Sequence, residues 1–106
     1  MWTRLESWAS FGVPDLLGYN DNCGFFMVEL KIQTGNKIKF SPHQILFHTT
    51  RTHRNFILVE QAREGGQRDI KLYSSLEINN LIHDPRTADP LAVNDFKKIQ
   101  KILINN

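Results

Sequence analysis

Residues 25–33 read FFMVELKIQ, and this stretch carries the clearest strand signal in the chain. Apolar and polar side chains alternate along it, which is the period of two expected for a strand with one covered face. The apolar side chains predicted to face a core are those of Val28, Leu30 and Ile32. Glu29 and Lys31 lie two positions apart, so their side chains are expected together on the opposite face of the sheet.

Turn and capping signals predict further elements on both sides of this strand. Strands are expected at residues 15–19, 56–60 and 70–73, and helices at residues 2–10, 41–50, shortly after 74, and 89–104. A strand, a helix and a second strand follow one another over residues 25–60. This order favours an α/β fold with a mixed sheet and helices packed on it.

Two of these helices have distinct start signals. Ser41 is placed as an N-cap, Pro42 suits the first helical position, and Gln44 completes a capping box. In the last helix Asp89 is the expected N-cap. The apolar residues that recur there at helical spacing are Ala92, Phe96, Ile99 and Leu103.

The composition is that of an ordinary globular domain. The chain has 106 residues, 41% of them hydrophobic and 23% charged, so one domain over residues 1–106 is expected. Cys23 is the only cysteine, which excludes an internal disulfide framework and a four-cysteine zinc site. No apolar stretch approaches the ~20 residues that span a bilayer, and no charged-then-apolar leader opens the chain. We therefore expect a cytoplasmic protein without membrane contact.

Charge is unevenly distributed, although the formal net charge is only +2. Residues 1–29 carry an excess of acidic side chains, whereas residues 30–59 carry five basic and no acidic ones. An acidic patch beside a basic one could pair a metal site with a track for phosphates. The alternative is the ordinary fluctuation of charge along a short chain.

Two carboxylates and a lysine form the strongest candidate site. Asp15 begins the strand expected at residues 15–19, and it converges with Glu29 if that strand neighbours residues 25–33. Two convergent carboxylates suit a hard cation such as Mg²⁺, which polarises phosphoryl oxygens and lowers the pKa of a bound water. Lys31 beside them could orient a water nucleophile or stabilise charge on phosphorus. The alternative for Glu29 and Lys31 is a solvated ion pair on an exposed sheet face.

Three short motifs occur in order around this site: GVPDLLG at residues 12–18, FMVELK at residues 26–31 and KFSPHQ at residues 39–44. In this order they resemble the PD-(D/E)xK nuclease superfamily, and more narrowly its stand-alone VRR-NUC and phage Holliday-junction-resolvase-like members. The resemblance covers about residues 6–73. It implies a restriction-endonuclease-like core and Mg²⁺-dependent endodeoxyribonuclease activity, with Mn²⁺ able to substitute.

The resemblance also implies roles for particular residues. Asp15 and Glu29 would be metal ligands, and the backbone carbonyl of Leu30 would complete the set from the protein. Lys31 would be the catalytic lysine. Gln44, at the start of its helix, would touch the metal-bound water or the DNA backbone. The alternative role for Gln44 is the capping box itself.

Other side chains are assigned to the edges of this site. Glu6 resembles the upstream helical acid that assists metal binding in many superfamily members, and its alternative is a surface acid on a short helix. The side chains expected to contact DNA phosphates are those of Lys37, Lys39, His43, Arg51 and Arg54. Each of these could instead belong to a solvated face. His48 is expected near the DNA-facing surface of its helix or simply exposed, and the histidine spacing does not form a zinc site.

The sequence thus predicts a structure-specific endonuclease of DNA recombination and repair, similar to Holliday junction resolvases and suited to a phage or mobile element. A homodimer would place two active sites across a branched DNA, with the C-terminal helix or the N-terminal tryptophans as its interface. The alternatives are a nicking or flap nuclease of the same fold, a non-catalytic DNA-binding module, and a structural protein with an incidental ion pair.

Overall fold

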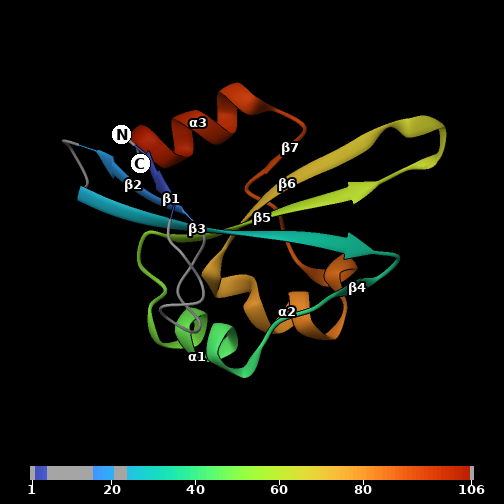
Figure 1. The fold of residues 1–106 in the computed structure, drawn as a ribbon, viewed down its shortest axis with the longest axis horizontal. Coiled ribbons are helices and arrows are strands. Elements are labelled where there is room, and N and C mark those ends of the chain that lie inside the picture. The colour runs from blue at the N-terminus through green and yellow to red at the C-terminus, as the bar shows by residue number, and fades with distance from the viewer. Residues whose placement is uncertain (1, 5–15, 21–23, 106) are drawn as a thin grey trace.

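The computed structural model describes residues 2–4, 16–20 and 24–105 (Figure 1). The strands are β1 (Trp2–Arg4), β2 (Leu16–Asn20), β3 (Gly24–Thr34), β4 (Lys37–Ile38), β5 (Asn55–Ala62), β6 (Arg68–Ser74) and β7 (Ala92–Val93). The α-helices are α1 (Pro42–Thr50), α2 (Ile78–His83) and α3 (Phe96–Asn105), and the short 3₁₀ helices are η1 (Glu64–Gly66), η2 (Ser75–Glu77) and η3 (Pro85–Thr87). The predicted α/β class, a mixed sheet flanked by helices, is confirmed. None of the helices in this described part has the length and apolar character needed to cross a lipid bilayer.

The strands form one sheet in the order β1-β2-β3-β5-β6-β7, and β4 pairs with β3. Among the described strands β3 and β5 are parallel, and the other neighbours are antiparallel. A parallel pair needs a crossover connection, and the segment containing α1 supplies it. The strands expected near residues 25–33, 56–60 and 70–73 and the helix expected at 41–50 are confirmed within a few residues.

The sheet has a hydrophobic core on each face, with α3 over one face and α1 and α2 over the other (Figure 1). The cluster on the α3 side contains Phe26, Val28, Phe56, Leu72, Ala92, Ile99 and Leu103. The cluster on the other side contains Ile38, Ile57, Val59, Tyr73, Ile78, Leu81 and Ala88. Neighbours such as Phe56 and Ile57 enter different clusters because successive side chains of a strand point to opposite faces.

The two faces of β3 are not buried as its sequence pattern predicts. Val28 is buried as expected, but Leu30 is 42% and Ile32 69% exposed, whereas Glu29 is only 1% exposed. The prediction that Leu30 and Ile32 face a core is therefore wrong, and the alternative of a solvated ion pair does not hold for Glu29, which lies on an inner face. The reason is tertiary: α1 lies over the face that carries Glu29, while α3 packs against the first part of the opposite face.

The N-terminal residues form a strand rather than a helix. Trp2 lies opposite Gly18 in the antiparallel pair of β1 and β2, so the helix predicted over residues 2–10 is wrong at its start. Pairing along the sheet gives the backbone groups hydrogen-bond partners, and such pairing overrides weak local helix propensity. Residues 5–10, the rest of that prediction, lie outside the described residues.

The helix predicted over residues 89–104 begins only at Phe96. Ala92, expected on its apolar face, instead lies in β7 and pairs with β6. The capping role expected of Asp89 belongs to Asp95, whose carboxylate accepts a hydrogen bond from the backbone N–H of the third helical residue. The backbone groups along the edge of β6 find partners in β7, which delays the start of the helix.

Candidate active site

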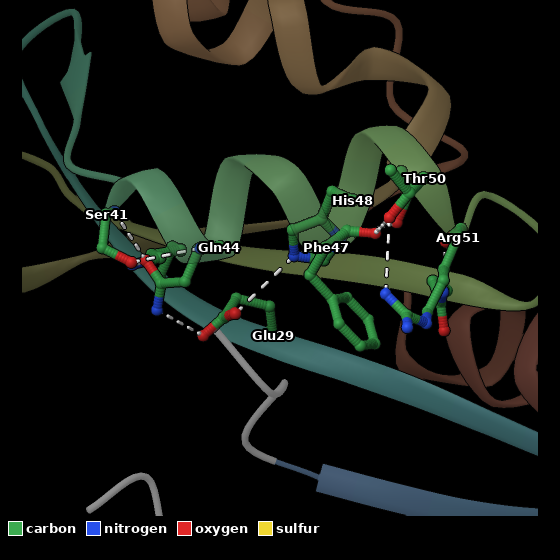
Figure 2. Close-up of polar contacts among 10 residues, drawn as sticks. Glu29, Ser41, Gln44, Phe47, His48, Thr50 and Arg51 are labelled. Carbon is green, nitrogen blue, oxygen red and sulfur yellow. Dashed lines mark hydrogen bonds and ion pairs between the residues drawn. The ribbon is translucent and has the colours of Figure 1, made fainter. Parts of the chain in front are cut away.

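The candidate site lies where β3 passes beneath the first turns of α1. Glu29 and Lys31 point from β3 toward this helix, and Gln44 contacts both of them. The Gln44 amide nitrogen donates to Glu29 Oε2 at 3.2 Å, and Lys31 Nζ donates to Gln44 Oε1 at 2.7 Å. The structure therefore brings together three of the residues that the sequence assigned to one site (Figure 2 shows the Gln44–Glu29 contact).

Gln44 caps α1 and contacts Glu29 and Lys31 at the same time. Its side-chain oxygen accepts from the backbone N–H of Ser41 at 3.0 Å, and the Ser41 hydroxyl accepts from the backbone N–H of Gln44 at 3.1 Å. The same oxygen accepts from Lys31, which leaves the amide nitrogen to face Glu29. The capping box, the first of the two roles considered for Gln44, is confirmed, and it is compatible with the contacts to Lys31 and Glu29 because the amide oxygen has two lone pairs and the amide nitrogen remains a donor.

A second contact restrains the ammonium group of Lys31. Lys31 Nζ lies 4.9 Å from the centroid of the Phe40 ring, within the range of a cation–π interaction. Phe40 immediately precedes the N-cap of α1, so the segment entering the helix fixes both the amide and the aromatic partner of the lysine. A lysine held at two points loses less conformational freedom when it meets a substrate.

His48 belongs to this site, and the prediction that it is exposed is wrong. Its side chain is 0% exposed, with Nδ1 2.7 Å from Ser75 Oγ and Nε2 3.6 Å from Glu29 Oε1. In Figure 2 the Glu29 carboxylate lies between Gln44 and His48, with a dashed contact to each. The spacing of four between Gln44 and His48 puts both side chains on one helix face, and this signal could have identified the histidine.

The remaining predicted metal ligands are only partly covered by the structure. Asp15 and Glu6 lie outside the described residues. Leu30 lies between Glu29 and Lys31 on β3 and turns its side chain to the opposite face, where it is exposed. Across the described ranges, no group of three or more histidine, cysteine, aspartate or glutamate side chains could hold a metal ion. Within these ranges Glu29 is the carboxylate of the site.

Several of the predicted phosphate contacts surround α1. Lys37 lies in β4, Lys39 follows it, and His43 is in the first turn of the helix, all with exposed side chains. Arg51 is exposed at the other end of α1, with its guanidinium carbon 5.1 Å from the Phe47 ring centroid. One open hollow on the surface is lined by Leu30, Lys31, Ile32, Thr34, Lys37 and Lys39. Leu30 and Ile32 line this hollow from the face of β3 opposite to the one from which Lys31 reaches Gln44, so Lys37 and Lys39 are the basic side chains that border it.

Arg54 has a different environment from the other basic residues. Its guanidinium donates to the backbone carbonyl of Leu103 at 2.7 Å and to that of Ile102 at 3.5 Å, near the C-terminus of α3. The group also lies 5.4 Å from the ring centroid of Phe26 and 5.7 Å from that of Phe56. The geometry gives Arg54 a packing role against α3 in place of the open phosphate contact expected from the sequence.

Replacing Arg54 with alanine should lower the free energy of unfolding by about 2 kcal/mol, because α3 loses a cation at its C-terminal carbonyls and two aromatic contacts. Arg51→Ala removes the same charge from an exposed position and should change stability by less than about 0.5 kcal/mol. Urea denaturation followed by circular dichroism measures both variants. Equal effects of the two substitutions would contradict the packing role.

Similarity to other proteins gives no further information about this site. A scan against protein-family models finds no match for the chain, and searches of curated proteins and of solved structures also find no match. The chemistry of the site therefore follows from the residues of this chain alone.

Proposed function

We propose that the chain is a metal-dependent DNA endonuclease with a restriction-endonuclease-like core, and that Glu29 and Lys31 are at its active centre. The observation that carries this proposal is the contact of Gln44 with both side chains. A buried carboxylate and an ammonium group two residues apart are held by one amide at the start of a helix. A solvated ion pair on an exposed sheet face, the main alternative, does not fit a glutamate that is buried.

The donor set at Glu29 fits a hard divalent cation. Carboxylate oxygens are the ligands that Mg²⁺ prefers, and each carboxylate oxygen retains acceptor capacity after it receives one hydrogen bond. Asp15, the second proposed ligand, is joined in the sequence to Leu16, and Leu16 pairs with Val28 beside Glu29. The backbone carbonyl of Leu30 is the third proposed ligand. Mn²⁺ has similar oxygen chemistry and is expected to substitute.

Each residue of the site has a different role in the proposed hydrolysis of a phosphodiester bond. Bound Mg²⁺ would supply Lewis-acid activation of water and of the phosphoryl oxygen. Glu29 would hold the cation, while the Lys31 ammonium would orient the attacking water and stabilise the negative charge that develops on the phosphoryl oxygens. Gln44 contacts both Glu29 and Lys31 and fixes the position of one relative to the other. Because its amide is also the cap of α1, the helix start and the reacting groups are positioned together.

The proposed substrate is DNA, held by the basic side chains near the site. Lys37 and Lys39 border a hollow that Leu30 and Ile32 also line, on the face of β3 opposite to the contact of Lys31 with Gln44. A phosphate bound in this hollow would extend the DNA contact beyond the active centre. His43 and Arg51, at the two ends of α1, would add further contacts with DNA phosphates.

The proposed form of the enzyme is a homodimer acting on branched DNA, because two copies place two sites across a branch point. The described structure limits how α3 can contribute to such an interface. Ile99 and Leu103 are buried against the sheet of their own protomer, and Phe96 is 66% exposed. Phe96 is therefore the part of this apolar pattern that remains accessible to a partner.

A cleavage assay with purified protein and Mg²⁺ tests the function. A labelled four-way junction, a flap, linear duplex and single-stranded DNA are compared. Paired symmetric cuts confined to the junction would support a resolvase. Cleavage of the flap, or nicks in the other substrates, would support the alternative of a flap or nicking nuclease. If the protein cleaves no DNA with Mg²⁺ or Mn²⁺ but binds DNA in a salt-sensitive manner, the proposed nuclease activity is overturned and a non-catalytic DNA-binding module is supported.

A further inference from the structure

His48 links Glu29 to a residue that lies far away in the sequence. The imidazole is fully buried, with Ser75 Oγ at 2.7 Å from Nδ1 on one side and Glu29 Oε1 at 3.6 Å from Nε2 on the other. Ser75 is itself buried at the start of η2, directly after β6. The contacts of His48 with Ser75 and Glu29 therefore connect the candidate site to η2.

The hydrogen bond to Ser75 determines which nitrogen of His48 carries the proton. Within the described residues, the Ser75 hydroxyl has no hydrogen-bond partner other than His48 Nδ1. A buried hydroxyl is satisfied if it donates its proton to Nδ1, whereas the opposite arrangement leaves it without an acceptor. The proton of the neutral imidazole is then on Nε2, which faces Glu29. This tautomer presents a donor to the carboxylate and has no lone pair on Nε2 with which to bind a metal.

Both oxygens of Glu29 then face a donor from the same helix. Gln44 Nε2 donates to Oε2, and His48 Nε2 lies 3.6 Å from Oε1, one helical turn further along, at the distance of an ion pair and slightly beyond that of a hydrogen bond. The hydrogen bond from Gln44 and the imidazole beside Oε1 both come from one rigid helix, and together they restrict rotation of the carboxylate about its last bond. Metal-binding carboxylates depend on such outer hydrogen bonds for their orientation.

The geometry points to His48 as a positioning residue that holds the Glu29 carboxylate in the orientation required for a divalent cation, with Ser75 fixing its tautomer. This inference rests on the proposed function, in which Glu29 is a metal ligand. It assigns a function to a buried polar pair that capping, core packing and DNA contact leave unexplained. It also extends the site from β3 and α1 to η2.

Calorimetric titration of the protein with Mn²⁺ tests this role without relying on DNA cleavage. His48→Leu should raise the Mn²⁺ dissociation constant about 10- to 100-fold, because the carboxylate loses the imidazole that lies beside Oε1. His48→Gln places an amide N–H near the position of Nε2 and should restore binding to within about threefold of the wild type. Ser75→Ala should weaken binding in the same direction by a smaller factor. His83→Gln, an exposed histidine substitution in α2, is the matched control and should bind as the wild type does.

The possible results separate this inference from the proposed function. If wild-type protein binds no Mn²⁺, both are overturned. If Glu29→Gln abolishes binding while His48→Leu binds as tightly as the wild type, the metal site stands and the positioning role is wrong. Equal losses in His48→Leu and His48→Gln would also overturn the donor role. Circular dichroism checks that each variant is folded, and if His48→Leu is unfolded, unchanged affinity in Ser75→Ala contradicts the inference.

Discussion

Glu29→Gln is expected to reduce the rate of DNA cleavage by about 1000-fold or more, while the protein remains folded. The substitution removes the negative charge that would bind the cation, and charge stabilisation of this kind is commonly the largest single contribution to catalysis. The shape of the side chain is retained, so packing beneath α1 should not change. Single-turnover cleavage of the preferred DNA with Mg²⁺ measures the effect.

Stability and activity should respond differently to this substitution. A neutral amide is less costly to bury than a carboxylate, although its single oxygen can face only Gln44 or His48 and not both. We therefore expect the free energy of unfolding to stay within about 1 kcal/mol of the wild-type value. Glu60→Gln on the adjacent strand β5 removes the same charge from a surface ion pair with Arg68 and should retain full activity. Cleavage by Glu29→Gln within tenfold of the wild-type rate would rule out Glu29 as a metal ligand.

The parts of the site that could be predicted are those encoded by neighbouring residues. The alternation over residues 25–33 identifies a strand and puts Glu29 and Lys31 on one face, and the structure has both features. The capping box of Ser41 and Gln44 identifies the start of α1 to the residue. These signals are local because a strand period and a helix cap depend on contacts within a few positions.

The side of β3 that is buried could not be predicted in the same way. An alternating pattern predicts that the apolar side faces the core, yet Ile32 is exposed and Glu29 is buried. Burial here depends on how far α3 extends over one face and on the position of α1 over the other. Neither quantity is encoded in the strand itself. A buried glutamate is stable only with partners, and those partners come from a later helix.

The contacts of His48 could not be predicted either, because they join residues that are even further apart in the sequence. Its contact with Ser75 joins residues separated by 27 positions, and no local pattern requires it. The helical spacing from Gln44 could have placed His48 on the inner face of α1. Its partner could be found only after β6 had been placed beside β5, because this pairing brings η2 against α1.

Replacement of Lys31 by methionine is expected to lower the cleavage rate about 100- to 1000-fold without loss of metal affinity. The ammonium group contacts Gln44 and lies over Phe40, so it occupies a defined position where charge develops on the phosphate. Methionine keeps an unbranched apolar chain in that space, which limits any effect on folding. The Mn²⁺ dissociation constant should remain within about threefold of the wild-type value.

This combination distinguishes the two charged residues of β3 by mechanism. Loss of Glu29 should abolish both metal binding and cleavage, whereas loss of Lys31 should affect cleavage alone, because the lysine acts on the transition state and not on the cation. Lys97→Met, an exposed substitution on α3 at the opposite face of the sheet, controls for the loss of one positive charge and should leave the rate unchanged. If Lys31→Met and Lys97→Met slow cleavage equally, and added salt slows the wild type in the same way, then Lys31 contributes only to general attraction of DNA. If Lys31→Met lowers the cleavage rate at saturating DNA and Lys97→Met does not, the effect of Lys31 is on the chemical step.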